Sequence, residues 1–326
     1  MTKKFLVTGA NGFVGKAVCS FLHNSGYVVQ GSVRNRNRQE YWPVNEIADI
    51  DSNTDWSKLL TGKDYVIHCA ARVHVMNDES SNSLNDYREV NTVGTMNLAR
   101  QAMESGVKRF IFVSSIKVNG ELTRLGKPFT SRDKRTPEDF YAQSKSEAEK
   151  QLLELAEQTG LEVVIIRPTL VYGPGVKANF ASLINLVSKG LPLPFGCITK
   201  NKRSLVSVKN LVDLIITCID HPNAVNQVFL VSDDNDVSTA SMINQMSKAL
   251  GKSNRIFPMP LWCYYLVGKI FGKQDIVKRL LGSLQVDISH TKETLNWMPP
   301  QTLEDGFRET AEAFLNNNKI IKEINK

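Results

Sequence analysis

Three glycines near the N-terminus constrain the fold of this chain more than any other feature. Residues 9–15 read Gly-Ala-Asn-Gly-Phe-Val-Gly, and they come after the apolar run Phe5-Leu6-Val7. Helical spacing of apolar residues continues over residues 15–25, so we predict a strand, a tight turn and a helix. Glycine lets the backbone turn sharply and approach a phosphate, and the free N–H groups at a helix N-terminus attract anions. The turn therefore predicts a site for the pyrophosphate of a dinucleotide.

The alternation of strand and helix continues to about residue 170. The predicted strands are 27–29, 65–69, 109–114 and 161–166, and the predicted helices are 92–105 and 141–158. Val/Ile-rich strands separated by helices indicate an α/β fold, a Rossmann-type doubly wound parallel sheet, over residues 1–170. The pattern then changes to loops rich in proline and glycine, with a strand near 226–231 and helices near 239–250 and 258–270. We therefore expect residues 171–326 to form a smaller, mixed substrate-binding region, some of whose strands return to the main sheet.

Composition excludes several classes of protein. Of the 326 residues, 42% are hydrophobic and 22% are charged, which is typical of a globular chain rather than a disordered or fibrous one. No apolar stretch approaches the ~20 residues that span a bilayer, and no signal-peptide core is visible, so we predict a soluble cytoplasmic protein. The net charge of +7 is not concentrated in a nucleic-acid motif, so no nucleic-acid partner is expected. The five cysteines contain no CxxC spacing, and no metal site is predicted.

The end of the second strand bears on the choice of dinucleotide. An acid about 20 residues beyond the glycines would bind the ribose 2′-hydroxyl of NAD. Here the chain reads Val33-Arg34-Asn35-Arg36 instead. A guanidinium can pair bidentately with a 2′-phosphate, so Arg34 favours NADP(H), with NAD(H) as the alternative. The alternative interpretation is that these arginines belong to a solvated surface loop and bind no cofactor.

A tyrosine and a lysine lie four residues apart at the start of the helix 141–158. Tyr141 and Lys145 would share one face of that helix, one turn apart. A phenol normally ionises near pH ~10, but a neighbouring ammonium stabilises the phenolate. Ser114 and Ser115 end the strand 109–114, at the edge where parallel sheets bind ligands. The pattern predicts proton exchange with an alcohol or sugar oxygen, whereas a tyrosine packed beside a solvated lysine is the alternative without function.

With these motifs in this order, the chain resembles the extended short-chain dehydrogenase/reductase family, also known as the NAD-dependent epimerase/dehydratase family. The resemblance continues through His68–Ala71, Asn91–Thr95 and Arg167–Pro174. It implies that Ser115 hydrogen-bonds the reacting oxygen, that Tyr141 is the acid/base, and that Lys145 holds the nicotinamide ribose and tunes Tyr141. The cofactor-binding residues that it implies are Gly9, Asn11, Gly12, Phe13, Val14, Gly15, Arg34, Asp49, Ile50, Ala70, Ala71, Asn91, Ser114, Tyr141, Lys145, Pro168 and Val171.

The resemblance also implies a UDP-sugar substrate. The substrate-binding residues would be Lys117, Asn119, Asn179, Arg203, Arg279 and Ser283. Among them, Asn179, Arg203 and Arg279 would take the diphosphate, and the small side chain of Ser283 would leave room for a 2-acetamido group. A homodimer through the helices that hold Asn91 and Tyr141 is also implied.

The two residues after Ser115 narrow the reaction. Dehydratases of the family carry an Asp-Glu pair there, and this chain has Ile116-Lys117, so dehydration is not expected. Redox chemistry at C4 of the sugar remains. Residues 73–78, 114–120, 173–180 and 282–287 most resemble a bacterial polysaccharide-locus subgroup, which implies a role in O-antigen or capsule synthesis.

Three functions are open at this point. The preferred one is reduction of UDP-4-keto-6-deoxy-N-acetylglucosamine to UDP-N-acetylquinovosamine. The alternative is a 4-epimerase of UDP-glucose or UDP-N-acetylglucosamine with tightly bound NAD. A non-catalytic NADP-sensing protein is the third, against which the complete serine, tyrosine and lysine set argues.

The segment Pro260–Val267 is apolar and has a helical pattern. It could rest on a membrane and serve a lipid-linked sugar. Core packing or a subunit contact is the preferred interpretation, because the stretch is short and lacks a polar face lined with lysine and arginine.

Overall fold

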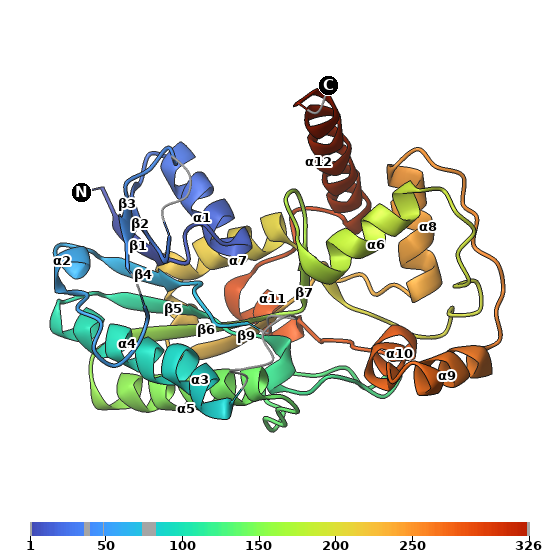
Figure 1. The fold of residues 1–326 in the computed structure, drawn as a ribbon. Coiled ribbons are helices and arrows are strands. Elements are labelled where there is room, and N and C mark those ends of the chain that lie inside the picture. The colour runs from blue at the N-terminus through green and yellow to red at the C-terminus, as the bar shows by residue number, and fades with distance from the viewer. Residues whose placement is uncertain (1, 36–39, 48, 74–82, 325–326) are drawn as a thin grey trace.

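The computed structural model describes residues 2–35, 40–47, 49–73 and 83–324, and its centre is a seven-stranded sheet in the order β3-β2-β1-β4-β5-β6-β9 (Figure 1). Every neighbouring pair of strands in this sheet is parallel. The predicted α/β fold with a doubly wound parallel sheet is therefore confirmed. The strands are β1 (Lys4–Thr8), β2 (Val28–Val33), β3 (Val44–Glu46), β4 (Tyr65–His68), β5 (Arg109–Val113), β6 (Glu162–Pro168) and β9 (Gln227–Val231).

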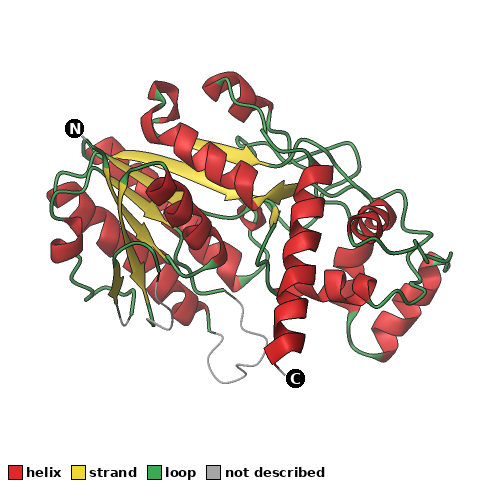
Figure 2. Cartoon of the chain, turned by 90° about the horizontal axis from the view of Figure 1, so that it is seen from above, coloured by secondary structure: helices red, strands yellow, loops and turns green. Residues whose placement is uncertain are grey.

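Alternate side chains of the strands supply two cores, one on each face of the sheet. On one face, Ile111 and Val113 of β5 pack with α1 (Phe13–Asn24) and α7 (Val208–Asp220). On the other face, Phe110 and Phe112 pack with α2 (Ser57–Leu60), α4 (Thr95–Glu104) and α5 (Phe140–Gln158). Figure 2 shows the sheet enclosed between these helices. Because both faces are covered, the middle strands carry apolar side chains on both of their faces, as in Phe110–Val113 of β5 and Val163–Ile166 of β6.

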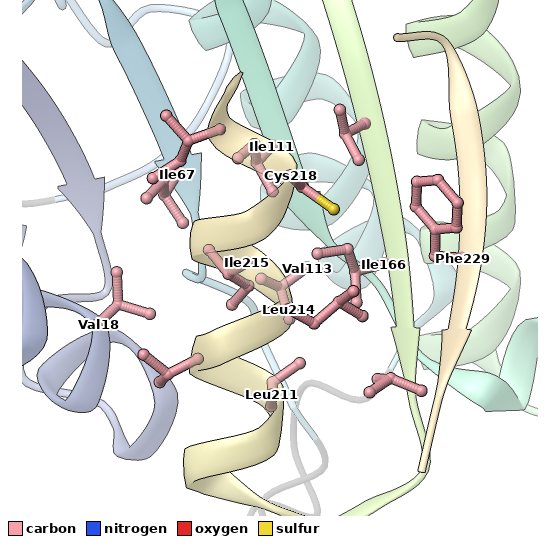
Figure 3. Close-up of a cluster of buried hydrophobic side chains, with 14 of the residues drawn as sticks. Val18, Ile67, Ile111, Val113, Ile166, Leu211, Leu214, Ile215, Cys218 and Phe229 are labelled. Atoms are coloured by element: carbon pink, nitrogen blue, oxygen red, sulfur yellow. The ribbon is translucent and has the colours of Figure 1, made fainter. Parts of the chain in front are cut away.

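Helix α7 was not predicted from the sequence, although its apolar residues recur at helical spacing. Figure 3 shows Leu211, Leu214, Ile215 and Cys218 of this helix directed at the sheet. The helix begins after Ser207, whose hydroxyl accepts a hydrogen bond from the backbone N–H of Asn210. It precedes β9, which lies beyond residue 170 and pairs with β6, so one core contains both halves of the chain.

The predicted helix 92–105 is preceded by two further helical segments. The chain enters through α3 (Leu84–Arg88), continues through a π-helical turn (Glu89–Gly94) and only then becomes α4. Gly94 is required at this turn, because a Cβ atom there would lie 2.6 Å from the carbonyl oxygen of Ile50. The π turn thereby holds the segment that carries Asn91 against the loop after β3.

The C-terminal region forms a smaller layer of helices beyond the carboxyl ends of the strands (Figure 1). A third core gathers Tyr172, Phe180 and Phe307, whose rings are in contact. Two short parallel strands, β7 (Leu170–Tyr172) and β8 (Leu205–Ser207), connect this layer to the main sheet. The helices of this layer are α6 (Ala178–Ser188), α8 (Thr239–Ala249), α9 (Leu261–Ile270), α10 (Gln274–Leu281) and α12 (Leu303–Ile324), whereas α11 (Ser289–Leu295) packs against β9 in the main core.

Candidate active site

The turn between β1 and α1 is closed so tightly that it needs its glycines. Gly9 has a φ of +65°, and a Cβ atom there would lie 2.9 Å from the backbone nitrogen of Ala70. A Cβ atom on Gly15 would lie 2.2 Å from the carbonyl oxygen of Gly9, closer than atoms can approach. Gly12 caps α1, and its N–H donates to Gly9 across the turn, at 2.8 Å. The first turn of α1 therefore offers its N–H groups without a side chain in front of them.

Two hollows flank this turn. One of about 260 Å³ is lined by the turn, the end of β2 and the segment after β4. It brings together eight predicted cofactor-binding residues, namely Gly9, Asn11, Gly12, Arg34, Asp49, Ile50, Ala70 and Ala71. The other, of about 680 Å³, is lined by Phe13, Lys16, Pro174 and Lys177 among others. The glycine cradle and the hollow beside it fit a dinucleotide, with Arg34 exposed at one wall and Asp49 at another. Arg36 lies outside the described residues.

The predicted catalytic residues meet at the carboxyl end of β5. Ser115 follows that strand in extended backbone, with φ −156° and ψ 147°. Its hydroxyl interacts with the Tyr141 hydroxyl and lowers the pKa of that phenol. Tyr141 lies in the first turn of α5, which begins after the cap residue Asp139, and Lys145 lies one turn further along. The Lys145 ammonium donates to the carbonyl oxygen of Val113 at 3.0 Å, directly before the serine pair.

Burial dominates the protonation of this cluster. It raises the pKa of Tyr141 to about 12; the Asp139 carboxylate also raises this pKa, and the hydrogen bond from Ser115 lowers it. Burial lowers the pKa of Lys145 to about 8. The Lys145 ammonium donates to the Val113 carbonyl, and the role of Lys145 in tuning Tyr141 stays a prediction. Among the described side chains, Asp139 and Ser115 are the ones that shift the Tyr141 pKa.

A buried carboxylate behind the catalytic residues was not predicted. Glu149 lies four residues beyond Lys145 on α5, and it accepts hydrogen bonds from Ser114, at 2.5 Å, and from Arg167, at 2.9 Å. Arg135 adds a third contact at 3.2 Å. The sequence signal that could have predicted it is the i, i+4 spacing from Lys145, which places Glu149 on the same inward face of the helix. Glu149 thus joins the ends of β5 and β6 to the catalytic helix.

Two predicted ligand contacts are engaged in this network. The Ser114 hydroxyl donates to Glu149, so it has a partner within the protein. Asn119 is fully buried, and its side chain accepts from Arg167 at 2.9 Å and donates to the Thr130 carbonyl at 3.0 Å. This placement favours a structural role for Asn119 over the predicted substrate contact, because its side chain is enclosed between β6 and the loop after the serines.

Asn91 also has its partners within the protein. Its side-chain oxygen accepts from the N–H of Arg72, at 2.8 Å, and its amide donates to Ser144 of α5, at 3.0 Å. The Asn91 carbonyl accepts from Thr95, whose hydroxyl is also bonded to the buried His68. Burial lowers the pKa of His68 to about 3, so the imidazole is neutral. Asn91 therefore ties the segment after β4 to the catalytic helix.

The predicted substrate residues fall into two places. Lys117 lies beside the start of α5, where its ammonium pairs with the cap residue Asp139, at 2.6 Å, and with Glu121, at 2.8 Å. Arg203 and Arg279 lie together, since the Arg203 guanidinium donates to the carbonyl oxygen of Arg279. Burial lowers the Arg203 pKa, and the Arg279 charge lowers it further.

Ser283 lies close to Arg279 in the chain and contacts both the C-terminal region and the loop after the serine pair. Its hydroxyl accepts from the N–H of Lys202 at 3.0 Å, and its carbonyl accepts from the N–H of Thr123.

The remaining predicted residues lie on three elements. Pro168 ends β6, Val171 lies in β7, and Val14 lies in the first turn of α1. The side chain of Asn179 and most of the segment 73–78 lie outside the described residues.

The described part of the chain holds no group of three or more histidine, cysteine, aspartate or glutamate side chains placed for a metal ion. Over the same residues, each helix is too short or too polar to cross a bilayer.

Comparison with known proteins agrees with this geometry. The family described as "NAD dependent epimerase/dehydratase family" matches residues 5–232. A UDP-glucose 4-epimerase of Vibrio cholerae is 61% identical over 319 residues, which cover 98% of this chain and 97% of that protein. An N-acetyl-α-D-glucosaminyl-diphospho-ditrans,octacis-undecaprenol 4-epimerase of Escherichia coli O157:H7 is 28% identical, covering 95% of each chain. The solved UDP-glucose 4-epimerase of Thermotoga maritima has the same fold, with a TM-score of 0.77, 21% identity and coverage of 97% and 99%.

Proposed function

Because this chain belongs to the NAD-dependent epimerase/dehydratase family of enzymes, we propose that it is a UDP-hexose 4-epimerase that interconverts UDP-glucose and UDP-galactose. The observation that carries the proposal is the 61% identity, over nearly the whole chain, to the Vibrio cholerae UDP-glucose 4-epimerase. The proposal is also supported by the presence of Ser115, Tyr141 and Lys145, the residues that proton exchange at the sugar oxygen needs. The 4-ketoreductase preferred from the sequence has no support among these relatives, and its alternative, the epimerase, fits better.

Tyr141 and Ser115 each have one task in this proposal, and Lys145 would hold the nicotinamide ribose. Tyr141 takes the proton of the sugar 4-hydroxyl and later returns it, and Ser115 hydrogen-bonds the same oxygen. Lys145 lies one turn from Tyr141 with its ammonium fixed by the Val113 carbonyl. A bound nicotinamide would supply the hydride acceptor and donor at C4. Inversion requires the sugar to present its other face before the hydride returns to C4. Because the same hydride returns, no cofactor is consumed.

One assay separates the epimerase from the reductase. Purified protein is given UDP-4-keto-6-deoxy-N-acetylglucosamine with excess NADPH, and separately UDP-galactose, and the nucleotide sugars are resolved by mass spectrometry and NMR. We expect UDP-glucose to form from UDP-galactose and NADPH to persist in the other tube. Rapid NADPH oxidation with formation of UDP-N-acetylquinovosamine, and no change in UDP-galactose, would show that the protein is the reductase instead.

Arg34 predicts the cofactor that the site prefers. If its guanidinium pairs with a 2′-phosphate, Arg34→Ala will weaken NADPH binding by about 1.5–3 kcal/mol and leave NADH nearly unchanged. That loss is roughly 10- to 150-fold in Kd, measurable by fluorescence titration of each nucleotide. Arg34→Lys is the matched control, because it keeps the charge but loses the paired geometry. A wild type that prefers NADH, or equal losses for both nucleotides, would assign the site to NAD.

The pair of Lys117 and Asp139 predicts a shift in pH dependence. The Asp139 carboxylate raises the Tyr141 pKa, and Lys117 offsets part of its charge. Asp139→Asn should therefore lower the Tyr141 pKa and move the acid limb of the kcat/KM profile to lower pH, whereas Lys117→Gln should move it to higher pH. Asparagine also caps helices, so α5 keeps its start. If both variants shift the acid limb in the same direction, the charges of Lys117 and Asp139 do not control the ionisation of Tyr141.

Ser283 bears on whether 2-acetamido sugars are also substrates. The name of the Escherichia coli relative describes an N-acetylglucosaminyl substrate, which favours testing this second class. If Ser283 borders the space for the acetamido group, Ser283→Tyr will lower kcat/KM for UDP-N-acetylglucosamine much more than for UDP-glucose. Ser283→Ala is the control, since it removes the bond to Lys202 without adding bulk. Parallel losses for both sugars would make Ser283 a structural residue.

The homodimer, the substrate-binding role of residues 171–326 and the place in O-antigen or capsule synthesis stay predictions from the resemblance. Sedimentation velocity tests the first of them directly.

A further inference from the structure

The hairpin of α9 and α10 presents its large apolar side chains to solvent. Trp262 is 65% exposed and Ile270 is 67% exposed, and the hairpin lies at the edge of the molecule in Figure 1. The preferred expectation that this segment packs into the core is therefore wrong for most of its side chains. The exposed apolar face consists of Phe257, Leu261, Trp262, Tyr265, Leu266, Val267, Ile270, Phe271 and Ile276.

The inner side of the hairpin is firmly packed, so the exposed face has a fixed position. Tyr264 is buried, and its ring stacks on Phe195 with the centroids 6.5 Å apart. α9 and α10 touch at Gly268, where a Cβ atom would lie 2.7 Å from the side chain of Val277. Tyr264 and Val277 join Ile198 in a small core of their own. The two helices thus form a packed unit in which most of the apolar side chains of α9 are turned outward.

The surroundings of this face are strongly basic. Residues 252–279 contain six basic side chains and a single acid, Asp275. All six are exposed. They are Lys252, Arg255, Lys269, Lys273, Lys278 and Arg279. The basic residues that the segment 260–267 lacks are therefore supplied by the adjoining loop and by α10.

We propose that the α9–α10 hairpin docks on the surface of an anionic lipid bilayer. Trp262 and Tyr265 have the amphipathic rings that favour the boundary between headgroups and acyl chains. The basic side chains would contact lipid phosphates, a combination typical of helices that lie in the plane of a membrane. A second copy of the chain fits the face less well, because a two-fold contact would place this basic surface against itself.

Docking would bring the membrane beside the predicted diphosphate site. The C-terminal end of α10 accepts hydrogen bonds from Arg203, through the carbonyl oxygens of Arg279 and Gly282. A sugar diphosphate carried by a membrane lipid would reach those arginines without leaving the bilayer surface. This consequence rests on the proposed function, whereas docking itself does not require turnover.

The experiment uses the full chain and vesicles of phosphatidylcholine, alone or with added phosphatidylglycerol. Trp262 is the natural probe, because Trp42, Trp56 and Trp297 are buried. We expect cosedimentation with the anionic vesicles, a blue shift of tryptophan emission and weakening by salt. Ile270→Glu should reduce vesicle binding about tenfold or more, since it places a charge on the apolar face. Met298→Glu is the matched control, because Met298 is 63% exposed elsewhere on the surface.

Three results would overturn the proposal. They are failure of the wild type to bind anionic vesicles, equal binding by Ile270→Glu, and a dimer in solution that Ile270→Glu dissociates, which would make the face a subunit contact. Turnover of UDP-galactose by Ile270→Glu, expected to equal that of the wild type, separates failure of docking from failure of the proposed function.

Discussion

Tyr141→Phe is expected to fold normally, retain cofactor and lose roughly 10²- to 10⁴-fold in kcat, the range for loss of a positioned acid/base. Phenylalanine keeps the aromatic ring of the half-buried Tyr141, and only the hydroxyl that interacts with Ser115 is removed. Because that hydroxyl acts in the transition state, KM should change far less than kcat. Steady-state conversion of UDP-galactose, with nucleotide released by denaturation to measure retained cofactor, checks both points.

Tyr65→Phe is the matched control for the loss of a phenol. The Tyr65 hydroxyl donates to Asp220 at 3.0 Å, at the other end of the sheet from the catalytic residues. We expect its turnover to equal that of the wild type. Near-normal turnover of Tyr141→Phe would remove Tyr141 from the acid/base role.

Glu149→Gln is expected to lower the free energy of unfolding by about 3–5 kcal/mol, which is the cost of removing one partner from a buried ion pair. Arg167 is 2% exposed and would keep its positive charge without a carboxylate to offset it. The glutamine has nearly the same shape, so the loss reports charge rather than a cavity. Urea unfolding followed by circular dichroism measures the difference.

A double-mutant cycle distinguishes this pairing from a general disturbance of α5. Glu149→Gln combined with Arg167→Met removes both charges, and replacing a whole buried pair costs much less than breaking it. We expect the double variant to be more stable than Glu149→Gln alone. Additive losses for the two substitutions would show that the residues act independently.

Local signals explain why much of the fold was predictable. The glycines at 9, 12 and 15 restrict the chain to one kind of turn, and the Val/Ile-rich runs require burial on both faces of a sheet. The serine at the end of β5 and the spacing of Tyr141 and Lys145 are likewise local, so their meeting follows from the strand order.

The features that escaped prediction depend on contacts between distant segments. Glu149 and Arg167 come from α5 and β6, and the Lys117 that pairs with Asp139 comes from the turn after β5. The hairpin is a different case. An apolar pattern in α9 predicts an apolar face but not whether the rest of the chain covers it, and here most of that face is left exposed.

The approach to equilibrium tests the central claim most directly. Purified protein without added nucleotide, or with a catalytic amount of NAD or NADP, is incubated with pure UDP-glucose in one tube and pure UDP-galactose in another, and both are followed by NMR. The epimerase account predicts that the two tubes converge on the same ratio of the two sugars with no net change in cofactor redox state. Unchanged sugars in both tubes, or conversion that stops when an added stoichiometric amount of reduced cofactor is consumed, would contradict it.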